Sequence, residues 1–387
     1  MDPAPDITNC ELGPIRPPSE ATSLLIRVTR NCPWNGCAFC SVYKRTRFSR
    51  RETAELLAEI ELLARAATRV RALSGGGPDG EVDSRKALAM IQAPDASDEE
   101  RRVALWLARG GRHVFLQDAD SLAIRPERLL PVLEALRGRF PTIDRVTTYA
   151  RSRTLCARTL EQLHDLRAAG LTRIHVGVES GSDRVLELVN KGCRAEHHVE
   201  GCRRAIAAGF EVCCYVMPGL GGRALSAEHA AETGLVLAAI DPQHVRLRTL
   251  WIDPGSPLAL LRDDGSFEYP EEEELVVEIR TLLGALRGCR GRVISDHERN
   301  LLVDLEGRLD TDADLLAGLC TRFLELDPVL RDAFVVARRA GYVRTLDTFL
   351  ASGELASRFV PVAADIRNRG AGSLIRGMEL EFGIRRL

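Results

Sequence analysis

Short stretches of alternating apolar and polar residues recur along the chain, and stretches with apolar residues three or four positions apart separate them. The alternating stretches have the period of a β-strand, and the intervening ones have the period of an amphipathic helix. The predicted strands are residues 24–29, 113–117, 145–151, 173–180, 211–217 and 244–249. The predicted helices between and after them are residues 52–73, 99–107, 126–136, 160–169, 195–208 and 226–239. This repeated order of strand and helix predicts an α/β fold with a parallel sheet and right-handed crossovers.

The alternation stops near residue 255. Beyond it the apolar residues recur with the helical period only, and the predicted helices are residues 271–286, 311–326 and 332–340. The strand–helix units are two fewer than the eight of a closed α/β barrel. We therefore expect a polar N-terminal segment at 1–22, a parallel α/β part at 23–255 and an α-rich C-terminal extension at 256–387.

The two faces of the predicted strands differ in polarity. In residues 244–249, Val245 and Leu247 lie on one face, and Arg246 and Arg248 lie on the other. The other charged residues on polar strand faces are Arg27, Arg145, Arg151 and Glu179. A closed barrel fills its interior with branched apolar side chains, so an interior lined by these polar faces predicts a bound ligand. A self-contained network of arginines and carboxylates is the alternative interpretation.

Three thiols lie in one short loop directly after the first predicted strand. Cys32, Cys37 and Cys40 follow the spacing C-x4-C-x2-C, and loops at the carboxyl ends of parallel strands hold active sites in α/β folds. A structural zinc site or a ferredoxin cluster takes four ligands from the protein. Three cysteines therefore predict a metal centre with one open position, and a zinc site with a distant fourth ligand is the alternative.

With Phe39 just before its last cysteine, this loop resembles the cluster-binding loop of the radical S-adenosylmethionine (SAM) superfamily. The superfamily's usual spacing has three residues between the first two cysteines, where this chain has four. The resemblance implies a partial (β/α)6 TIM-like barrel at 23–255 with the α-rich extension behind it. It also implies a [4Fe-4S] cluster on Cys32, Cys37 and Cys40, S-adenosyl-L-methionine as cosubstrate, and a low-potential electron donor such as flavodoxin or ferredoxin.

The reaction implied by the resemblance is reductive cleavage of SAM to a 5′-deoxyadenosyl radical, which takes hydrogen from a small-molecule substrate. Asp118 and Asp120 occupy the place of the segment that contacts the amino group of SAM, and Glu179 occupies that of a group contacting the ribose or the methionine. Gly219 and Gly221 resemble the loop that lies against adenine. The complete set of residues expected at the cosubstrate is Phe39, Asp118, Asp120, Arg151, Glu179, Gly219, Gly221, Arg246 and Arg248.

The predicted inward charges do not balance. Arg27, Arg151, Arg246 and Arg248 outnumber Glu179, and SAM brings only one carboxylate. Because a buried guanidinium requires an oxygen partner, the excess predicts an anionic substrate.

A second motif, residues 294–300, resembles a feature of uncharacterised radical enzymes distantly like the coproporphyrinogen oxidases. Asp296 and His297 within it are candidates for orienting the substrate or relaying a proton. The same residues also predict the start of a capped helix, with Ser295 as the N-cap and Glu298 three positions later. We favour the capped helix.

Composition narrows the possible partners. The formal net charge of −2 and the pI near 6.5 give no general attraction to nucleic acid or to an anionic membrane. The first twenty residues are polar and rich in proline, unlike a signal peptide. We therefore expect a cytoplasmic protein with reduced thiols and no nucleic-acid or membrane partner. About twenty residues precede the first predicted strand, so we expect no N-terminal cobalamin-binding domain.

Two interpretations stay open beside the radical enzyme. One is a non-catalytic zinc or iron–sulfur binding protein. The other is an ordinary barrel hydrolase or lyase, against which stands the lack of a Ser-His-Asp or metal-ligand His pattern at the other strand ends.

Overall fold

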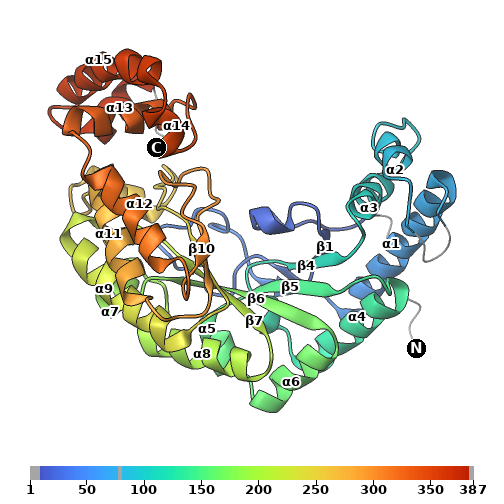
Figure 1. The fold of residues 1–387 in the computed structure, drawn as a ribbon. Coiled ribbons are helices and arrows are strands. Elements are labelled where there is room, and N and C mark those ends of the chain that lie inside the picture. The colour runs from blue at the N-terminus through green and yellow to red at the C-terminus, as the bar shows by residue number, and fades with distance from the viewer. Residues whose placement is uncertain (1–8, 77–80, 383–387) are drawn as a thin grey trace. The chain divides into compact units, whose positions relative to one another are not determined.

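The structure, a computed structural model, describes residues 9–76 and 81–382 (Figure 1). Residues 1–8 of the predicted N-terminal segment lie outside the described residues. The chain forms two compact units, each assembled from several segments. The first unit consists of Met1–Asn35, Arg45–Val176 and Gly201–Val212, and the second of Gly36–Lys44, Gly177–Glu200 and Cys213–Leu387.

The strands of the first unit pair in parallel. They are β1 (Leu24–Arg27), β4 (His113–Gln117), β5 (Arg145–Ala150) and most of β6 (Leu171–Glu179). Leu24 of β1 is opposite Val114 of β4, and β4 pairs in turn with β5 and β5 with β6. A separate antiparallel pair, β2 (Thr29–Arg30) with β3 (Ser49–Arg50), closes the base of the cysteine loop. The predicted strand at 24–29 is therefore two strands, because Thr29 and Arg30 pair with β3.

Helices connect the strands of the first unit. They are α1 (Thr53–Ser74), α2 (Ser84–Met90), α3 (Asp98–Ala108), α4 (Pro126–Arg139), α5 (Ser152–Cys156) and α6 (Leu160–Ala168), with the 3-10 turns η1 (Pro18–Glu20) and η2 (Ser121–Ala123). Helix α1 packs against α2, α3 and α4 (Figure 1). It begins with a capping box between Glu52 and Glu55, and it ends at Gly75, whose φ of 78° only glycine adopts without strain.

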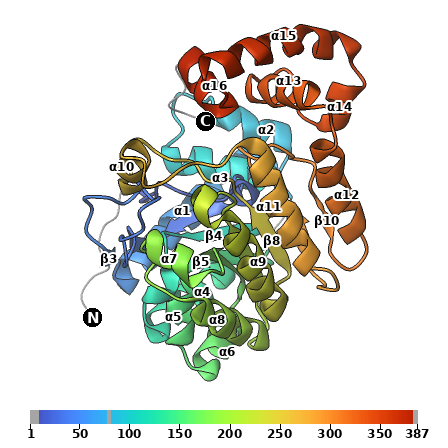
Figure 2. The same cartoon turned by 90° about the vertical axis from the view of Figure 1, so that its left-hand side faces the viewer.

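The second unit continues the alternation and then becomes helical. Its strands are the end of β7 (Glu211–Val216), β8 (His244–Leu247), β9 (Arg292–Ile294) and β10 (Gly307–Arg308). Its helices are α7 (Asp183–Leu188), the start of α8 (Ala195–Ala207), α9 (Gly222–Ile240), α10 (Pro257–Asp263), α11 (Glu272–Ala285), α12 (Ala313–Leu324), α13 (Pro328–Arg339), α14 (Leu346–Leu350), α15 (Gly353–Arg369) and α16 (Leu374–Phe382). Helix α11 packs on α9 and α12, and α15 packs on α13, α14 and α16 (Figure 2).

The hydrogen-bonded strand order is β1-β4-β5-β6-β7-β8-β9-β10. Strand β9 runs parallel to β8, and β10 runs antiparallel to β9. The predicted α/β fold class, with a mostly parallel sheet and a helix-rich C-terminal part, is confirmed. The sequence pattern missed β9, which lies within the part predicted to be helical.

Within residues 9–76 and 81–382, every helix is too short or too polar to cross a membrane.

Candidate functional site

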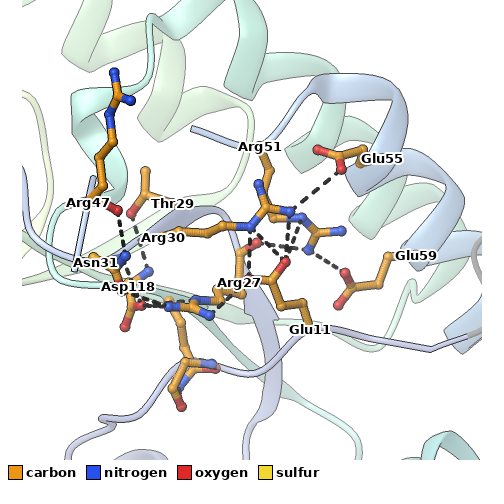
Figure 3. Close-up of polar contacts among 12 residues, drawn as sticks. Glu11, Arg27, Thr29, Arg30, Asn31, Arg47, Arg51, Glu55, Glu59 and Asp118 are labelled. Carbon is orange, nitrogen blue, oxygen red and sulfur yellow. Dashed lines mark hydrogen bonds and ion pairs between the residues drawn. The ribbon is translucent and has the colours of Figure 1, made fainter. Parts of the chain in front are cut away.

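The base of the cysteine loop is fixed by a buried carboxylate in the first unit (Figure 3). Asp118 follows β4, and its Oδ2 accepts hydrogen bonds from Nη2 of Arg27 at 2.7 Å and from Nε at 3.0 Å. The same oxygen accepts the backbone N–H of Asn31 at 3.3 Å, and the backbone N–H of Asp118 donates to Oγ1 of Thr29 at 3.4 Å. Asp118 therefore holds the residues immediately before Cys32.

Arg27 is paired on both sides. Besides Asp118, it reaches Oε1 of Glu11 through Nη1 at 2.8 Å, and Glu11 also pairs with Arg30 at 2.8 Å (Figure 3). Two carboxylates thus neutralise Arg27 and its neighbour. Arg27 contributes no surplus positive charge, which corrects the count made from the strand faces and confirms the network interpretation at this position.

Asp120 lies in a different environment from Asp118. It is fully buried, and Oγ1 of Thr154 donates to its Oδ2 at 2.5 Å. Burial raises the pKa of Asp120 to about 6, although the Thr154 hydroxyl and the Arg151 guanidinium oppose the shift. Its Oδ1 accepts no hydrogen bond from the described residues. Such an unsatisfied buried acceptor fits a site that a donor group of a ligand completes.

Arg151 contacts the cysteine loop itself. Its guanidinium carbon lies 5.3 Å from the centroid of the Trp34 ring, a cation–π contact. Trp34 stands between Cys32 and Cys37, so Arg151 supports the first half of the loop. The backbone N–H of Asn35 in that half donates to Sγ of Cys32 at 3.4 Å.

The second half of the loop is anchored within the second unit. The backbone N–H of Ala38 donates to the carbonyl of Val189 at 2.8 Å, and the carbonyl of Ala38 accepts the N–H of Leu258 at 2.9 Å. Phe39 packs against a buried apolar cluster that includes Met217. The backbone between Cys37 and Cys40 is therefore fixed on both sides, as cluster ligands require.

Glu179 forms an ion pair that the sequence did not reveal. Its Oε1 lies 3.2 Å from Nζ of Lys191, and each of the two side chains is 12% exposed. Nζ of Lys191 is also 5.5 Å from the centroid of the Phe39 ring. Burial lowers the pKa of Lys191, but the negative charges of Glu179 and Cys37 outweigh it and the net shift is upward. This ammonium group lies beside the cysteine loop and stays charged.

Two glycines make room for the turn that carries Glu179. A Cβ on Gly177 would lie 2.3 Å from Oε1 of Glu179, and one on Gly181 would lie 2.4 Å from the carbonyl of Glu232. The φ of Glu179 is 63°, a strained left-handed conformation for a residue with a side chain. The turn therefore depends on glycines to present this carboxylate.

A buried polar network supports the predicted adenine loop after β7. The backbone N–H of Gly219 donates to Oε1 of Glu278 at 2.7 Å, and Oγ of Ser226 donates to Oε2 at 2.7 Å. His229 Nε2 lies 3.1 Å from the carbonyl of Met217, which can only accept, so Nε2 carries the proton. Its Nδ1 then accepts the hydroxyl of Ser180 at 2.8 Å.

Burial dominates the ionisation of this network. It raises the pKa of Glu278 to about 7 and lowers the pKa of His229 to about 4. Glu278, protonated below about pH 7, and His229, neutral above about pH 4, thus hold the turn after Glu179 and the loop at Gly219 in fixed positions. The φ of Gly219 is 88°, and a Cβ on it would lie 2.9 Å from Leu275, so this position requires glycine.

The predicted helix start at Ser295 is wrong. Residues 295–300 form an irregular loop after β9, because the Ser295 hydroxyl donates to the carbonyl of Leu302 at 2.7 Å and so does not cap a helix. Asp296 lies 3.2 Å from Arg246, the side chain of which is buried. Arg248, which the strand pattern placed inward with Arg246, is exposed.

The donor set fits an iron–sulfur cluster with one open iron. Cys32, Cys37 and Cys40 are half-buried thiols, and the eleven cysteines, all among the described residues, form no disulfide. Among the residues that the structure describes, no three His, Cys, Asp or Glu side chains are gathered as ligands of a single metal ion. In the first unit the N–H donor to Cys32, and in the second unit the ammonium group of Lys191 near Cys37, are each suited to the ligands of an anionic sulfur cluster.

Comparisons with known proteins agree with this site. The family model described as the radical SAM superfamily matches residues 26–233, a segment that includes the three cysteines, Glu179 and Gly219. Enzymes of this family use a [4Fe-4S] cluster and S-adenosylmethionine.

Curated relatives match parts of the chain. The heme chaperone HemW of Bacillus subtilis is 23% identical over 163 residues, 42% of each chain. A biotin synthase of Arthrobacter sp. is 31% identical over 119 residues, 30% of this chain and 32% of the relative. The chain thus spans less than half the length of these relatives.

Solved structures are similar at low identity. Coproporphyrinogen III oxidase (HemN) from Escherichia coli has a TM-score of 0.44 and 16% identity, covering 68% of this chain and 52% of that one. Methylornithine synthase (PylB) has a TM-score of 0.43 and 14% identity, covering 76% and 69%. The family model covers more than half of the residues, and the chain belongs to the radical SAM superfamily.

Proposed function

We propose that this protein holds one [4Fe-4S] cluster on Cys32, Cys37 and Cys40, and that it cleaves S-adenosylmethionine reductively to abstract hydrogen from a small-molecule substrate. The observation that carries the proposal is the anchoring of the cysteine loop. Asp118 fixes the residues before Cys32, and the two backbone hydrogen bonds of Ala38 fix the segment from Cys37 to Cys40. A preorganised ligand set of this kind is what a metal centre requires.

Held by Cys32, Cys37 and Cys40, the cluster would supply the one electron that reductive cleavage of the C5′–S bond of SAM to methionine and a 5′-deoxyadenosyl radical requires. The residues of this chain bind and orient the cosubstrate. Glu179 offers acceptor oxygens to hydroxyl or amino groups, and Lys191 offers N–H donors to a carboxylate. Oδ1 of Asp120 can accept one further donor. Bare backbone at Gly219 and Gly221 lets a flat ring approach closely.

The test measures cluster content and turnover directly, because relatives of this chain carry the names of both enzymes and a heme chaperone. Protein reconstituted without oxygen is assayed for iron, sulfide and absorbance near about 400 nm. Dithionite, standing in for a donor such as flavodoxin or ferredoxin, should release 5′-deoxyadenosine from SAM. Replacing Cys32, Cys37 or Cys40 with Ala should abolish both the cluster and this product.

The matched control is Cys156→Ala, a half-buried cysteine outside the loop, which should keep a full cluster. A full cluster in the single-cysteine variants of the loop would refute the ligand assignment. Bound zinc, or a cluster that yields no 5′-deoxyadenosine, would favour the non-catalytic metal-binding protein instead.

A further inference from the structure

The loop at residues 295–300 is fixed against the end of β8. Oδ1 of Asn300 accepts the backbone N–H of Thr249 at 2.9 Å and its hydroxyl at 3.0 Å. Nδ2 of Asn300 donates to the carbonyl of Leu247 at 2.9 Å and to Oγ of Ser295 at 2.9 Å. Asn300 is buried, so all of these bonds are shielded from water. The loop therefore takes one position relative to Arg246 and Arg248.

Helix α13 fixes the same loop through its carbonyl groups. Nη2 of Arg338 donates to the carbonyls of Glu298 at 3.0 Å and Asn300 at 3.1 Å. Nη1 of Arg339 donates to the carbonyl of Arg299 at 2.7 Å. Two side chains of another helix thus hold three consecutive residues, which gives a preorganised backbone of the kind found in binding sites.

The contacts of Asp296 and Asn300 place the loop that carries His297 and Arg299 beside Arg246 and Arg248 at the end of β8. Burial, followed by the charges of Arg248, Arg299 and Arg246, lowers the pKa of His297 to about 4. The pKa of Arg299 is also lowered, by burial and by the charges of Arg339 and Arg248, although Glu298 opposes the shift. Cations therefore crowd this part of the second unit.

Carboxylates pair with some of these cations, and Glu272 pairs with Arg339. Asp296 lies 3.2 Å from Nη2 of Arg246, whose Nη1 donates to the hydroxyl of Tyr215 at 3.2 Å. The guanidinium carbon of Arg299 lies 3.7 Å from the centroid of the Trp251 ring, so this cation–π contact restricts where the group can move. Glu298 is exposed, where water screens its charge.

We propose that Arg246, Arg248, His297 and Arg299 form a binding site for an oxyanion, a carboxylate or phosphate group carried by the substrate. Guanidinium forks bind both groups in a bidentate manner, and a neutral imidazole adds an N–H donor. Asp296 occupies Arg246 in the free protein, and the incoming oxyanion replaces it. The identity of the ligand as the substrate rests on the proposed function, whereas the oxyanion site itself does not.

The test is calorimetric titration of the reconstituted full chain with sodium phosphate and, separately, sodium acetate, with chloride holding the ionic strength constant. Arg248→Met and Arg299→Met should weaken phosphate or acetate binding at least tenfold, because each removes one guanidinium. Asp296→Asn should strengthen binding severalfold, because it removes the competing carboxylate. The matched control is Arg358→Met, an exposed arginine stacked on Tyr342 at 4.4 Å, which should bind like the wild type.

The anion that binds more tightly identifies the group on the substrate. Wild-type protein that prefers neither anion to chloride would overturn the proposal, and so would unchanged binding in Arg248→Met and Arg299→Met. Weaker binding by Asp296→Asn would also overturn it, since a purely structural Asp296 leaves the loop disordered when replaced.

A competition arm separates this site from that of the cosubstrate. Saturating SAM should leave phosphate or acetate binding unchanged, and displacement by SAM would assign the arginines to the carboxylate of SAM and overturn the substrate assignment. The same preparations are assayed for 5′-deoxyadenosine. Intact oxyanion binding without SAM cleavage would count against the proposed function alone.

Discussion

Asp118 is a fully buried carboxylate with donors on one oxygen from both Arg27 and the backbone of Asn31. A buried charge is tolerated only where it is paired and hydrogen-bonded. Its partners here are Arg27 and Asn31, and Asn31 directly precedes Cys32. The side chain therefore acts on the loop that holds the cysteines.

We predict that Asp118→Asn lowers the free energy of unfolding by about 3–5 kcal/mol, because it leaves the mostly buried Arg27 with one carboxylate fewer. The measurement is urea unfolding of the apo protein. The control is Asp144→Asn, which breaks an exposed pair with Arg112 and should cost less than about 1 kcal/mol. Unchanged stability together with weakened SAM binding would instead assign Asp118 to the cosubstrate.

Glu179 and Lys191 give a prediction that separates binding from stability. Glu179→Gln should weaken SAM binding by about 1–3 kcal/mol, the range for a hydrogen bond to a charged group. It also leaves the ammonium group of Lys191 without this carboxylate, so adding Lys191→Met should restore stability without restoring SAM binding. SAM binding is measured by titration, and stability is measured by thermal unfolding.

The control for this pair is Glu211→Gln, at an exposed ion pair with Arg173, which should change neither quantity. A double variant that regains SAM affinity together with its stability would make Glu179 a structural residue. A single variant with full affinity would lead to the same conclusion.

At the scale of elements, Glu278 connects α11 to the loop after β7 and to the start of α9. Its two oxygens take the backbone N–H of Gly219 and the hydroxyl of Ser226, and its side chain is 2% exposed. The carboxyl group of Glu278 is therefore buried between these elements, and burial favours its protonated form. Burial raises the pKa of Glu278 to about 7 from an ordinary 4.5, and this shift reflects the free-energy cost of ionising the buried carboxyl group.

The pH dependence follows from the direction of this shift. Because the pKa is raised in the folded state, the stability contributed by protonated Glu278 is complete below about pH 4.5 and is lost as the pH rises through 7. The stability contributed by neutral His229 has the opposite pH dependence, because its pKa is lowered to about 4 in the folded state. This contribution is lost as the pH falls below 6.5 and through 4. The two effects oppose each other between pH 4.5 and 6.5.

We predict that Glu278→Gln gains roughly 2–3 kcal/mol relative to the wild type between pH 5 and pH 8, since the amide carries no charge to bury. Nε2 of His229 lies 3.3 Å from Oε1 of Glu278, so the effect of His229 is not identical in the two proteins, and the part of the curve above pH 6.5, where His229 is neutral, isolates Glu278. Urea unfolding at several pH values measures the gain. The exposed Glu325→Gln should follow the wild-type curve, and a Glu278→Gln curve parallel to the wild type would contradict a buried proton.

The elements themselves were largely predictable, because periodicity is a local property of the sequence. Each predicted strand and helix of the alternating part is present, with ends that differ by a few residues, except that the predicted strand at 24–29 forms two strands. Strand β9 was missed because its three residues, Arg292–Ile294, are too few to show alternation. The helix at Ser295 was predicted from capping letters, but tertiary hydrogen bonds from Ser295 and Asn300 determine the loop.

The candidate site could be predicted only where the spacing of residues along the sequence indicates their chemistry. The spacing of the three cysteines can be recognised in the sequence. The glycines around Glu179 stand at positions where close packing leaves no room for a side chain. Lys191 is one of three lysines in the chain, and the sequence around it does not indicate that its side chain is buried. Its ion pair depends on burial and on the turn at Asn190 and Gly192, with φ of 48° and 69°. These are properties of the folded chain, which no local pattern contains.

For the molecule as a whole, the predicted boundary at residue 255 marks a change of pattern, and the contacts of the second unit continue across it. Strand β9 pairs with β8, Asn300 binds the end of β8, and Glu278 binds the loop after β7. We infer that residues 256–387 contain parts that the second unit requires for folding, although they follow the alternating strands in sequence.

Truncation tests this inference. A chain ending at residue 255 loses all three of these contacts, so buried donors at Gly219 and Thr249 lose their acceptors at a cost of about 1–3 kcal/mol each. It also exposes the apolar face of α9 that α11 covers. We expect this chain to show no cooperative unfolding by circular dichroism and to load no cluster.

A chain ending at residue 327 keeps β9, α11 and the loop at 295–300, and it should unfold cooperatively and load the cluster. Because it lacks Arg338 and Arg339, which hold that loop, it should bind phosphate or acetate more weakly. Cooperative folding and cluster loading by the chain ending at 255 would show that the alternating part folds alone and would refute the inference.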